Sequence, residues 1–156
     1  MIPTLIDAYL HEHGLRFEHL VHGRTVAAQR LAAAEHIAGQ RVAKVVVLTV
    51  DGRLSLAVVA APAQVDLELL RRVLGAQSIE LAPEEQFADL FSPCEAGAEP
   101  PLSLFGLPIF VDAVLTREPW LLMRGGTHED AIQVDTDAWL LSEKARIVDG
   151  LGATVQ

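Results

Sequence analysis

The chain has 156 residues, 51% of them hydrophobic, and a formal net charge of −9 from 12 basic and 21 acidic residues. This length allows one domain, residues 1–156, to fold without disulfides or a metal, and the single cysteine suits a reducing cytosol. The negative charge disfavours broad, nonspecific binding to a phosphate backbone, but it permits local contact with a nucleic-acid end.

The N-terminus has no basic leader, and no apolar run is long enough to span a bilayer, so we expect a cytoplasmic protein. The hydrophobic periodicity predicts alternating helices and strands. Helices are expected over residues 3–13, 26–37, 67–74, 83–91 and 136–144, and strands over 16–21, 43–50, 53–60, 78–81, 109–111, 120–123 and 131–134. Asp51-Gly52 predicts a tight hairpin, because both residues tolerate positive φ. This pattern favours a mixed, partly antiparallel α/β sheet surrounded by helices.

Lys44 is the first candidate for chemistry, because it interrupts an otherwise apolar strand. Period two places it beside Val46 and Leu48, where an ammonium is costly unless its head reaches water, a partner or a cleft. One interpretation is a cation at the mouth of a cleft that holds a phosphate or a polarised carbonyl. The other is a lysine whose head simply extends to water.

Two glycine-containing segments are further candidates. Gly97 and Pro101 form a Gly-x-x-x-Pro pattern in the long loop over residues 92–108, and such loops are often functional. Gly125 and Gly126 directly follow a strand and can expose backbone N–H groups to an oxyanion, or simply make a sharp turn. His128 could act as a proton carrier or be merely exposed.

The histidines, the cysteine and the known sequence motifs give weaker evidence for a functional site. His11 and His13 are two residues apart on a predicted helix and therefore point in different directions, which argues against a metal site. Cys94 has no evident base nearby, so a catalytic thiol is not favoured. The sequence contains no phosphate-binding or dinucleotide-binding glycine motif and no nucleophile elbow.

Taken in order, several short segments agree with one known family. They are Thr25-Val26-Ala27-Ala28 at the start of a helix, the strand Val42–Leu48, the helix Asp66–Leu70 with Leu74-Gly75-Ala76, the loop Gly97–Pro101, the strand Pro108–Asp112 and the turn Arg124–His128. Between Thr25 and Trp139 the chain thus resembles the YbaK/prolyl-tRNA synthetase-associated family of aminoacyl-tRNA deacylases.

The resemblance implies a mixed α/β fold with a barrel-like sheet. It implies hydrolysis of the ester between a mischarged small amino acid, such as alanine, serine, threonine or cysteine, and the 3′ adenosine of a tRNA. The expected partner is the tRNA acceptor end, with a synthetase or elongation factor as a further partner and neither DNA nor a membrane. The resemblance implies no metal and no cofactor, action in trans, and help from the substrate's own ribose hydroxyl in activating water.

The resemblance also implies roles for individual residues. Lys44 would anchor the terminal adenosine or its phosphate, while Gly97 and Gly126 would complete the catalytic set by holding the ester carbonyl and lining the pocket. The expected substrate-binding residues are Thr25, Pro101, Asp112, Gly125 and His128.

Two other functions remain open at this point. The absence of an obvious base and the acidic composition also fit a noncatalytic module on the same fold that binds a small ligand or a protein. Hydrolysis of a free aminoacyl ester, without the tRNA body, is a third possibility. Assays with a panel of mischarged tRNAs separate these alternatives.

Overall fold

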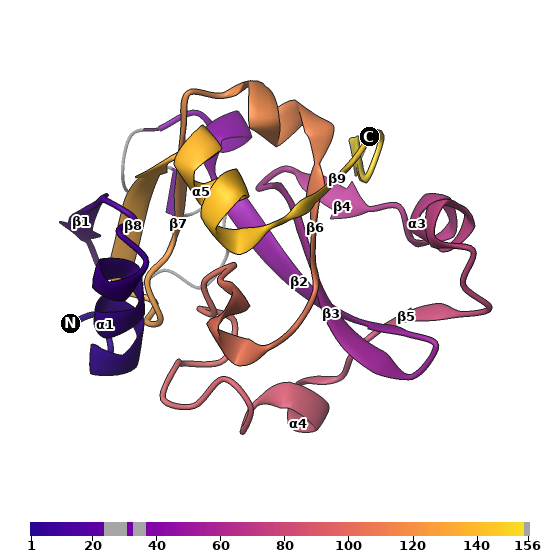
Figure 1. The fold of residues 1–156 in the computed structure, drawn as a ribbon, viewed down its shortest axis with the longest axis horizontal. Coiled ribbons are helices and arrows are strands. Elements are labelled where there is room, and N and C mark those ends of the chain that lie inside the picture. Colours follow the sequence, from indigo (N-terminus) through magenta and orange to yellow (C-terminus); the bar gives the residue numbers. More distant parts are fainter. Residues whose placement is uncertain (24–30, 33–36, 155–156) are drawn as a thin grey trace.

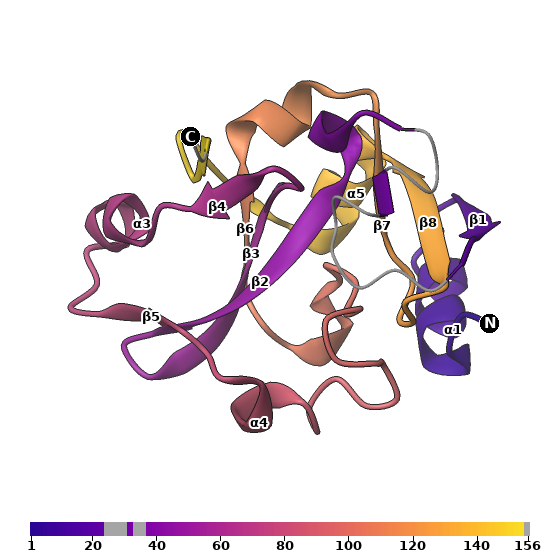
Figure 2. The same cartoon turned by 180° about the vertical axis from the view of Figure 1, so that it is seen from behind.

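The computed structural model describes residues 1–23, 31–32 and 37–154, and its strands form three sheets (Figures 1 and 2). The largest sheet has the order β5-β2-β3-β6-β9, the second β1-β8-β7 and the smallest β10-β4. The strands are β1 (Phe17–Val21), β2 (Ala43–Val50), β3 (Arg53–Ala60), β4 (Ala63–Val65), β5 (Ile79–Leu81), β6 (Ile109–Asp112), β7 (Trp120–Arg124), β8 (Asp130–Asp135), β9 (Arg146–Val148) and β10 (Gly152–Thr154). Both views place α1 and β1 at one end of the molecule and α3 and β5 at the other.

The helices are short. The α-helices are α1 (Thr4–Glu12), α3 (Leu67–Leu74), α4 (Glu84–Phe87) and α5 (Thr136–Glu143), and the 3₁₀ helices are η1 (Gly39–Arg41), η2 (Ser103–Phe105) and η3 (Ala113–Arg117). Helix α3 has the ends that its sequence predicts: the Asp66 side chain accepts a hydrogen bond from Leu69 N–H, and Gly75 closes the helix in the left-handed region. Asp135 caps α5 in the same way. In the part of the chain that is described, no helix combines the length and apolarity needed to cross a bilayer.

The hairpin β2–β3 has the predicted limits, and its turn residues Asp51 and Gly52 have φ of 49° and 84°. The mixed character of the sheet is also confirmed, because β2–β3 and β2–β5 are antiparallel whereas β3–β6 and β6–β9 are parallel. The two larger sheets meet at an isolated parallel bridge between Val42 and Leu122. The described strands therefore do not close into the barrel that was expected.

The two faces of the β2–β3 hairpin pack against different parts of the chain. Ala43, Val47 and Val58 point into the main core, which is completed by α1 and by Phe91 and Leu102 of the long loop region. Leu48, Ala57 and Val59 point the other way, toward α3. A third cluster joins Val42, Ala61, Leu122 and Ala131 with Leu31 and Ala32. Lys44 stands on the face that carries the second and third clusters.

Several predicted elements differ from the structure. The helix expected over 83–91 ends at Phe87 and continues as turns, and the tail contains the short strands β9 and β10. Neither strand has a strong hydrophobic pattern in its sequence. Each is stabilised by pairing with a distant segment, β9 with β6 and β10 with β4. The helix expected over 26–37 lies largely outside the described residues, and Thr25, expected to cap it, lies outside them as well.

Candidate functional site: a lysine and an arginine beside a glycine turn

Lys44 lies on β2 opposite Val59 of β3, half-buried, and its ammonium donates a hydrogen bond to the backbone carbonyl of Ala63 on β4. Its neighbours on this face of β2 are Val42, in the third cluster, and Val46, beside the second. The charge therefore stands where two apolar clusters meet. Loss of water on burial lowers the pKa of Lys44 below its usual value of 10.5.

Arg124 is a second cation on the same surface. The isolated parallel bridge aligns Val42 with Leu122, and Lys44 and Arg124 each lie two residues further along, on the same face of their own strand as the bridged residue. Arg124 is 6% exposed, and its guanidinium donates from Nη1 to the carbonyl of His128, 3.5 Å away. Burial lowers the pKa of Arg124 below its usual value. We call Lys44 and Arg124 the cation pair.

Arg124 was not predicted as a site residue, although the segment Arg124–His128 carries part of the family resemblance. The available signal was the one that singled out Lys44: a basic residue at the end of an apolar strand, here Trp120–Met123. The register that aligns the two cations depends on contact between β2 and β7, which are far apart in the sequence.

The structure joins the two glycine-containing segments directly. The N–H of Gly126 donates to the carbonyl of Ala98 at 3.0 Å, and the N–H of Glu95 donates to the carbonyl of Gly126 at 2.8 Å. Gly97 packs against His128, since a Cβ atom added to Gly97 would lie 3.4 Å from Cε1 of that ring. The Gly125–His128 turn and the Gly97 loop thus form one unit.

His128 is part of this unit and is not an exposed loop residue. It is 4% exposed; its backbone N–H donates to the Glu95 carboxylate at 3.0 Å, and its ring Nε2 lies 2.8 Å from the carbonyl oxygen of Ala96. The N–H of Gly97 donates to Oε1 of Glu99 at 3.0 Å. The amides of Gly97 and Gly126 therefore both have acceptors inside the protein.

The remaining predicted residues lie in two places. Asp112 is buried and accepts hydrogen bonds from the N–H groups of Val114 and Gly152. Gly152 in turn lies next to Ala63, since a Cβ atom added to the glycine would be 3.1 Å from Cβ of Ala63. The Asp112 carboxylate is therefore close to β4, whose Ala63 carbonyl accepts the hydrogen bond from Lys44. Pro101 precedes η2, and its carbonyl accepts a hydrogen bond from Nε1 of the buried Trp139 at 2.9 Å.

Asp130 fixes the far side of the glycine turn. This buried carboxylate accepts hydrogen bonds from the Met1 ammonium at 2.8 Å and from Thr127 at 2.5 Å, and it pairs with His19 at 2.6 Å. Burial by itself would raise the pKa of Asp130, but these partners outweigh it and lower the pKa to about 2. The backbone carbonyl of Asp130 also accepts from the N–H of Gly125.

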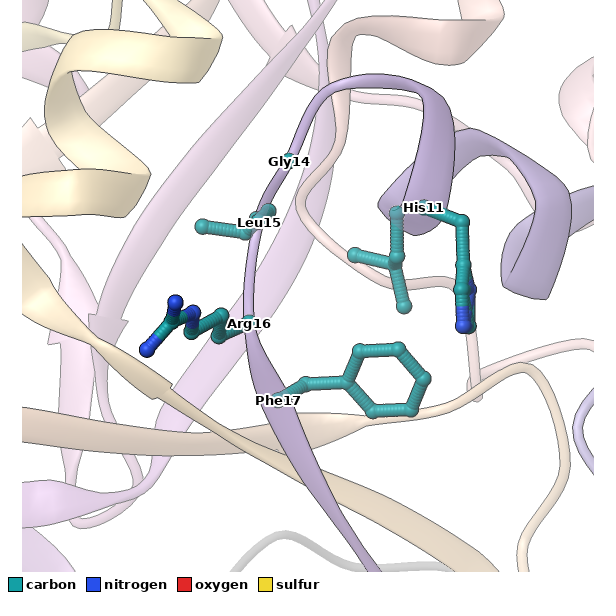
Figure 3. Close-up of a pocket in the computed structure, with 6 residues that line it drawn as sticks. His11, Gly14, Leu15, Arg16 and Phe17 are labelled. Atoms are coloured by element: carbon teal, nitrogen blue, oxygen red, sulfur yellow. The ribbon is translucent and has the colours of Figure 1, made fainter.

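The hollows of the described surface differ in their relation to these residues. Figure 3 shows one of about 660 Å³ where α1 meets β1, with Phe17 beside His11 and Arg16 turned to the other side of the chain. No predicted site residue lines it. A hollow of about 500 Å³ lies at the start of β7, between Arg41 and Trp120. No group of three potential metal ligands occurs among the described residues.

Comparison with known proteins identifies the family. Residues 22–140 match the aminoacyl-tRNA editing domain, so the chain belongs to that family. No curated protein matches.

Among solved structures, the hypothetical protein APE2540 matches with a TM-score of 0.85 and 15% identity over 96% of this chain and 99% of its own. A candidate trans-editing enzyme for prolyl-tRNA synthetase matches with a TM-score of 0.79 and 21% identity over 96% and 98%. A protein from Marinobacter aquaeolei assigned to signal transduction matches with a TM-score of 0.72 and 20% identity, over 96% of this chain and 30% of its own. These likenesses show the fold.

Proposed function

We propose that this protein hydrolyses the ester bond between a mischarged small amino acid and the 3′ adenosine of a tRNA, and that it acts in trans. The observation that carries the proposal is the cation pair in a chain of the editing-domain family: Lys44 on β2 and Arg124 at the end of β7, next to the glycine turn, are both partly desolvated basic groups. Action in trans is supported by the candidate trans-editing enzyme, which aligns with this chain over nearly its whole length.

The cation pair suits the charge that this reaction involves. The substrate brings a phosphate next to the terminal ribose, and attack of water on the ester places negative charge on the carbonyl oxygen. Lys44 stands where two apolar clusters meet, and Arg124 is buried, so charge–charge interactions at both cations are stronger than in bulk water. We assign Lys44 to the phosphate or carbonyl oxygen nearest β4, and Arg124 to the side next to the glycine turn.

The ester is already activated, so the protein needs positioning and charge stabilisation more than a strong nucleophile. We assign the activation of water to the ribose hydroxyl of the substrate. Gly97 and Gly126 become positioning residues in this proposal, because their N–H groups bond within the protein and their lack of side chains lets the loop and the turn pack together. His128, Gly125, Pro101, Asp112 and Thr25 remain proposed contributors to the pocket.

An acidic protein can act on RNA in this way if it grips only the acceptor end. Two cations at the point of chemistry provide local attraction, while the net charge of −9 disfavours contact along the tRNA body. Discrimination among amino acids would follow from pocket size, which separates side chains that differ by one methylene only weakly. Alanine, serine, threonine and cysteine therefore all belong in the substrate panel.

The experiment is a deacylation assay with tRNAs mischarged with each of these four amino acids. We expect catalytic turnover of at least one, and a roughly 100-fold fall in kcat for Lys44→Ala and for Arg124→Gln. Lys144→Gln, at an exposed position after α5, is the matched control and should retain full activity. Binding without turnover by the wild-type protein would contradict the proposal and favour the noncatalytic module. Full activity of Lys44→Ala would remove Lys44 from the site.

A further inference from the structure

The outer face of β7 carries more than Arg124. Trp120, Leu122 and Arg124 alternate with residues that point into the main core, so all three lie on one face. Trp120 is only partly buried, and it lines two hollows, of about 500 and 430 Å³. A partly exposed tryptophan that borders two hollows, on the same strand face as a proposed catalytic cation, is a feature that the deacylation chemistry does not use.

Arg41 is already oriented for stacking. Its guanidinium lies over the Trp120 ring with 4.8 Å between Cζ and the ring centroid, and its Nε donates to Glu118 at 3.0 Å. The Arg41 side chain is 39% exposed, so part of the guanidinium still faces solvent. Planar groups fixed in this way are the surfaces on which unpaired bases stack in RNA-binding proteins.

The charges around the hollows decide which part of a nucleotide fits. Glu118 lines one hollow, and Glu18 and Asp135 line the other, so a phosphate is disfavoured there despite Arg41 and Arg16. A neutral base is not repelled. Cytosine, adenine and guanine each carry an exocyclic amino group that can donate to these carboxylates, whereas uracil does not. Of these bases, cytosine is the one next to the terminal adenosine in the CCA end of tRNA.

We propose that Trp120 and Arg41 form a site for an unpaired cytosine, the one that adjoins the terminal adenosine in the CCA end of tRNA. This inference rests on the proposed function, because it takes the adenosine and its ester to lie at the cation pair. Trp120 and Arg124 are four residues apart, which corresponds to ~13 Å along a strand. The site therefore suits a neighbouring nucleotide and not the one that carries the ester.

The first test measures binding without any chemistry. An RNA hairpin with a single-stranded 3′ CCA end is titrated while tryptophan emission is recorded. The other tryptophan, Trp139, is fully buried, and its share of the emission is measured in the Trp120→Phe variant. We expect saturable quenching in the wild type, roughly fivefold weaker binding when the adjoining cytosine is replaced by uracil, and none with a blunt hairpin. Equal quenching by the cytosine and uracil hairpins, or no quenching by either hairpin, would overturn the proposal.

The second test uses Arg41 to separate stacking from charge. Arg41→Lys keeps the charge but loses the plane, so it should weaken binding of the CCA hairpin as much as Arg41→Gln does. Arg72→Gln, on exposed α3, is the matched control and should bind normally. If Arg41→Lys binds like the wild type, the contact is electrostatic and the stacking site is wrong.

The third test separates this inference from the proposed deacylation. Trp120→Leu, which keeps an apolar side chain against Leu122, should raise KM for mischarged tRNA roughly fivefold with kcat retained. It should leave hydrolysis of an aminoacyl-adenosine, which lacks the cytosine, unchanged. Loss of activity on both substrates would overturn the inference and indicate a structural role. If the wild type shows no deacylation but its Trp120 emission responds to the CCA hairpin, the proposed function fails while the cytosine site stands.

Discussion

Gly126 lies so close to Pro3 that a Cβ atom added to the glycine would stand 2.8 Å from Cδ of the proline ring. Gly126 also has φ of 99°, a conformation that residues with a side chain rarely adopt. The glycine turn is therefore held by its contact with the start of α1 as well as by its hydrogen bonds to the loop.

Gly126→Ala should destabilise the fold by about 2 kcal/mol or more, because strain from the positive φ adds to the clash with Pro3. Gly75→Ala is the matched control: its φ is 64°, but an added Cβ would meet nothing within 4 Å, so its cost should be conformational alone. Urea unfolding of both variants measures the difference. The double variant Pro3→Ala/Gly126→Ala should recover part of the loss, and purely additive losses would show that the clash does not matter.

Lys44 should lower the stability of the protein at neutral pH. Since its folded-state pKa lies below the unfolded value of 10.5, the unfolded chain holds the proton more tightly. This cost is fully present below the folded pKa and disappears as pH rises to 10.5. Lys44→Met should therefore raise Tm at pH 7 by roughly 2 °C while lowering kcat for deacylation as much as Lys44→Ala does, and the gain in Tm should shrink at alkaline pH. A lower Tm for Lys44→Met at pH 7 would contradict this reasoning. Lys144→Met should leave Tm unchanged.

Asp130 should contribute stability with the opposite dependence on pH. Its pKa falls from 3.8 unfolded to about 2 folded, so its contribution is complete above pH 3.8 and is lost as pH falls through about 2. Asp130→Asn should cost about 2 kcal/mol at pH 7, and most of this difference should be lost near pH 2. Urea unfolding at both pH values checks this, with the exposed Asp89→Asn as control. A difference that is the same at both pH values would assign the loss to packing and not to charge.

Cys94 should be unreactive in the folded protein. Burial, with a further contribution from Glu99, raises the pKa of its thiol to about 11, so little thiolate exists at neutral pH. Iodoacetamide should modify Cys94 slowly in the native protein and rapidly after unfolding in urea, as mass spectrometry would show. Cys94→Ala should retain deacylation. Fast alkylation accompanied by loss of activity would instead place the thiol in the chemistry.

Short-range signals in the sequence were sufficient for part of the fold. The Asp51-Gly52 turn and the helix between Asp66 and Gly75 are specified by adjacent residues, and both have the predicted limits. The parallel pairing of β3 with β6, and of β6 with β9, depends on segments far apart in the chain, so periodicity could not reveal it.

In the candidate site, too, some residues could be predicted from their neighbours in the sequence, and others only from contacts between distant segments. Lys44 was recognisable because a charge in an apolar strand is unusual in itself. Arg124 gains its significance only from the alignment of Val42 with Leu122, and Asp130 only from distant partners such as His19. Thr25 lies outside the described residues, as does most of the helix that it was expected to cap, so its place in the pocket remains a prediction.

The Val42–Leu122 bridge has a kinetic consequence. The β2–β3 hairpin closes over a two-residue turn and can form early, whereas β2 and β7 can meet only after a long stretch of intervening chain has been ordered. Chains that have regained their hairpin would still lack aligned cations. During refolding from urea, the proposed deacylation should therefore return later than the β-strand signal in circular dichroism. The activity assay would then report the last step of folding.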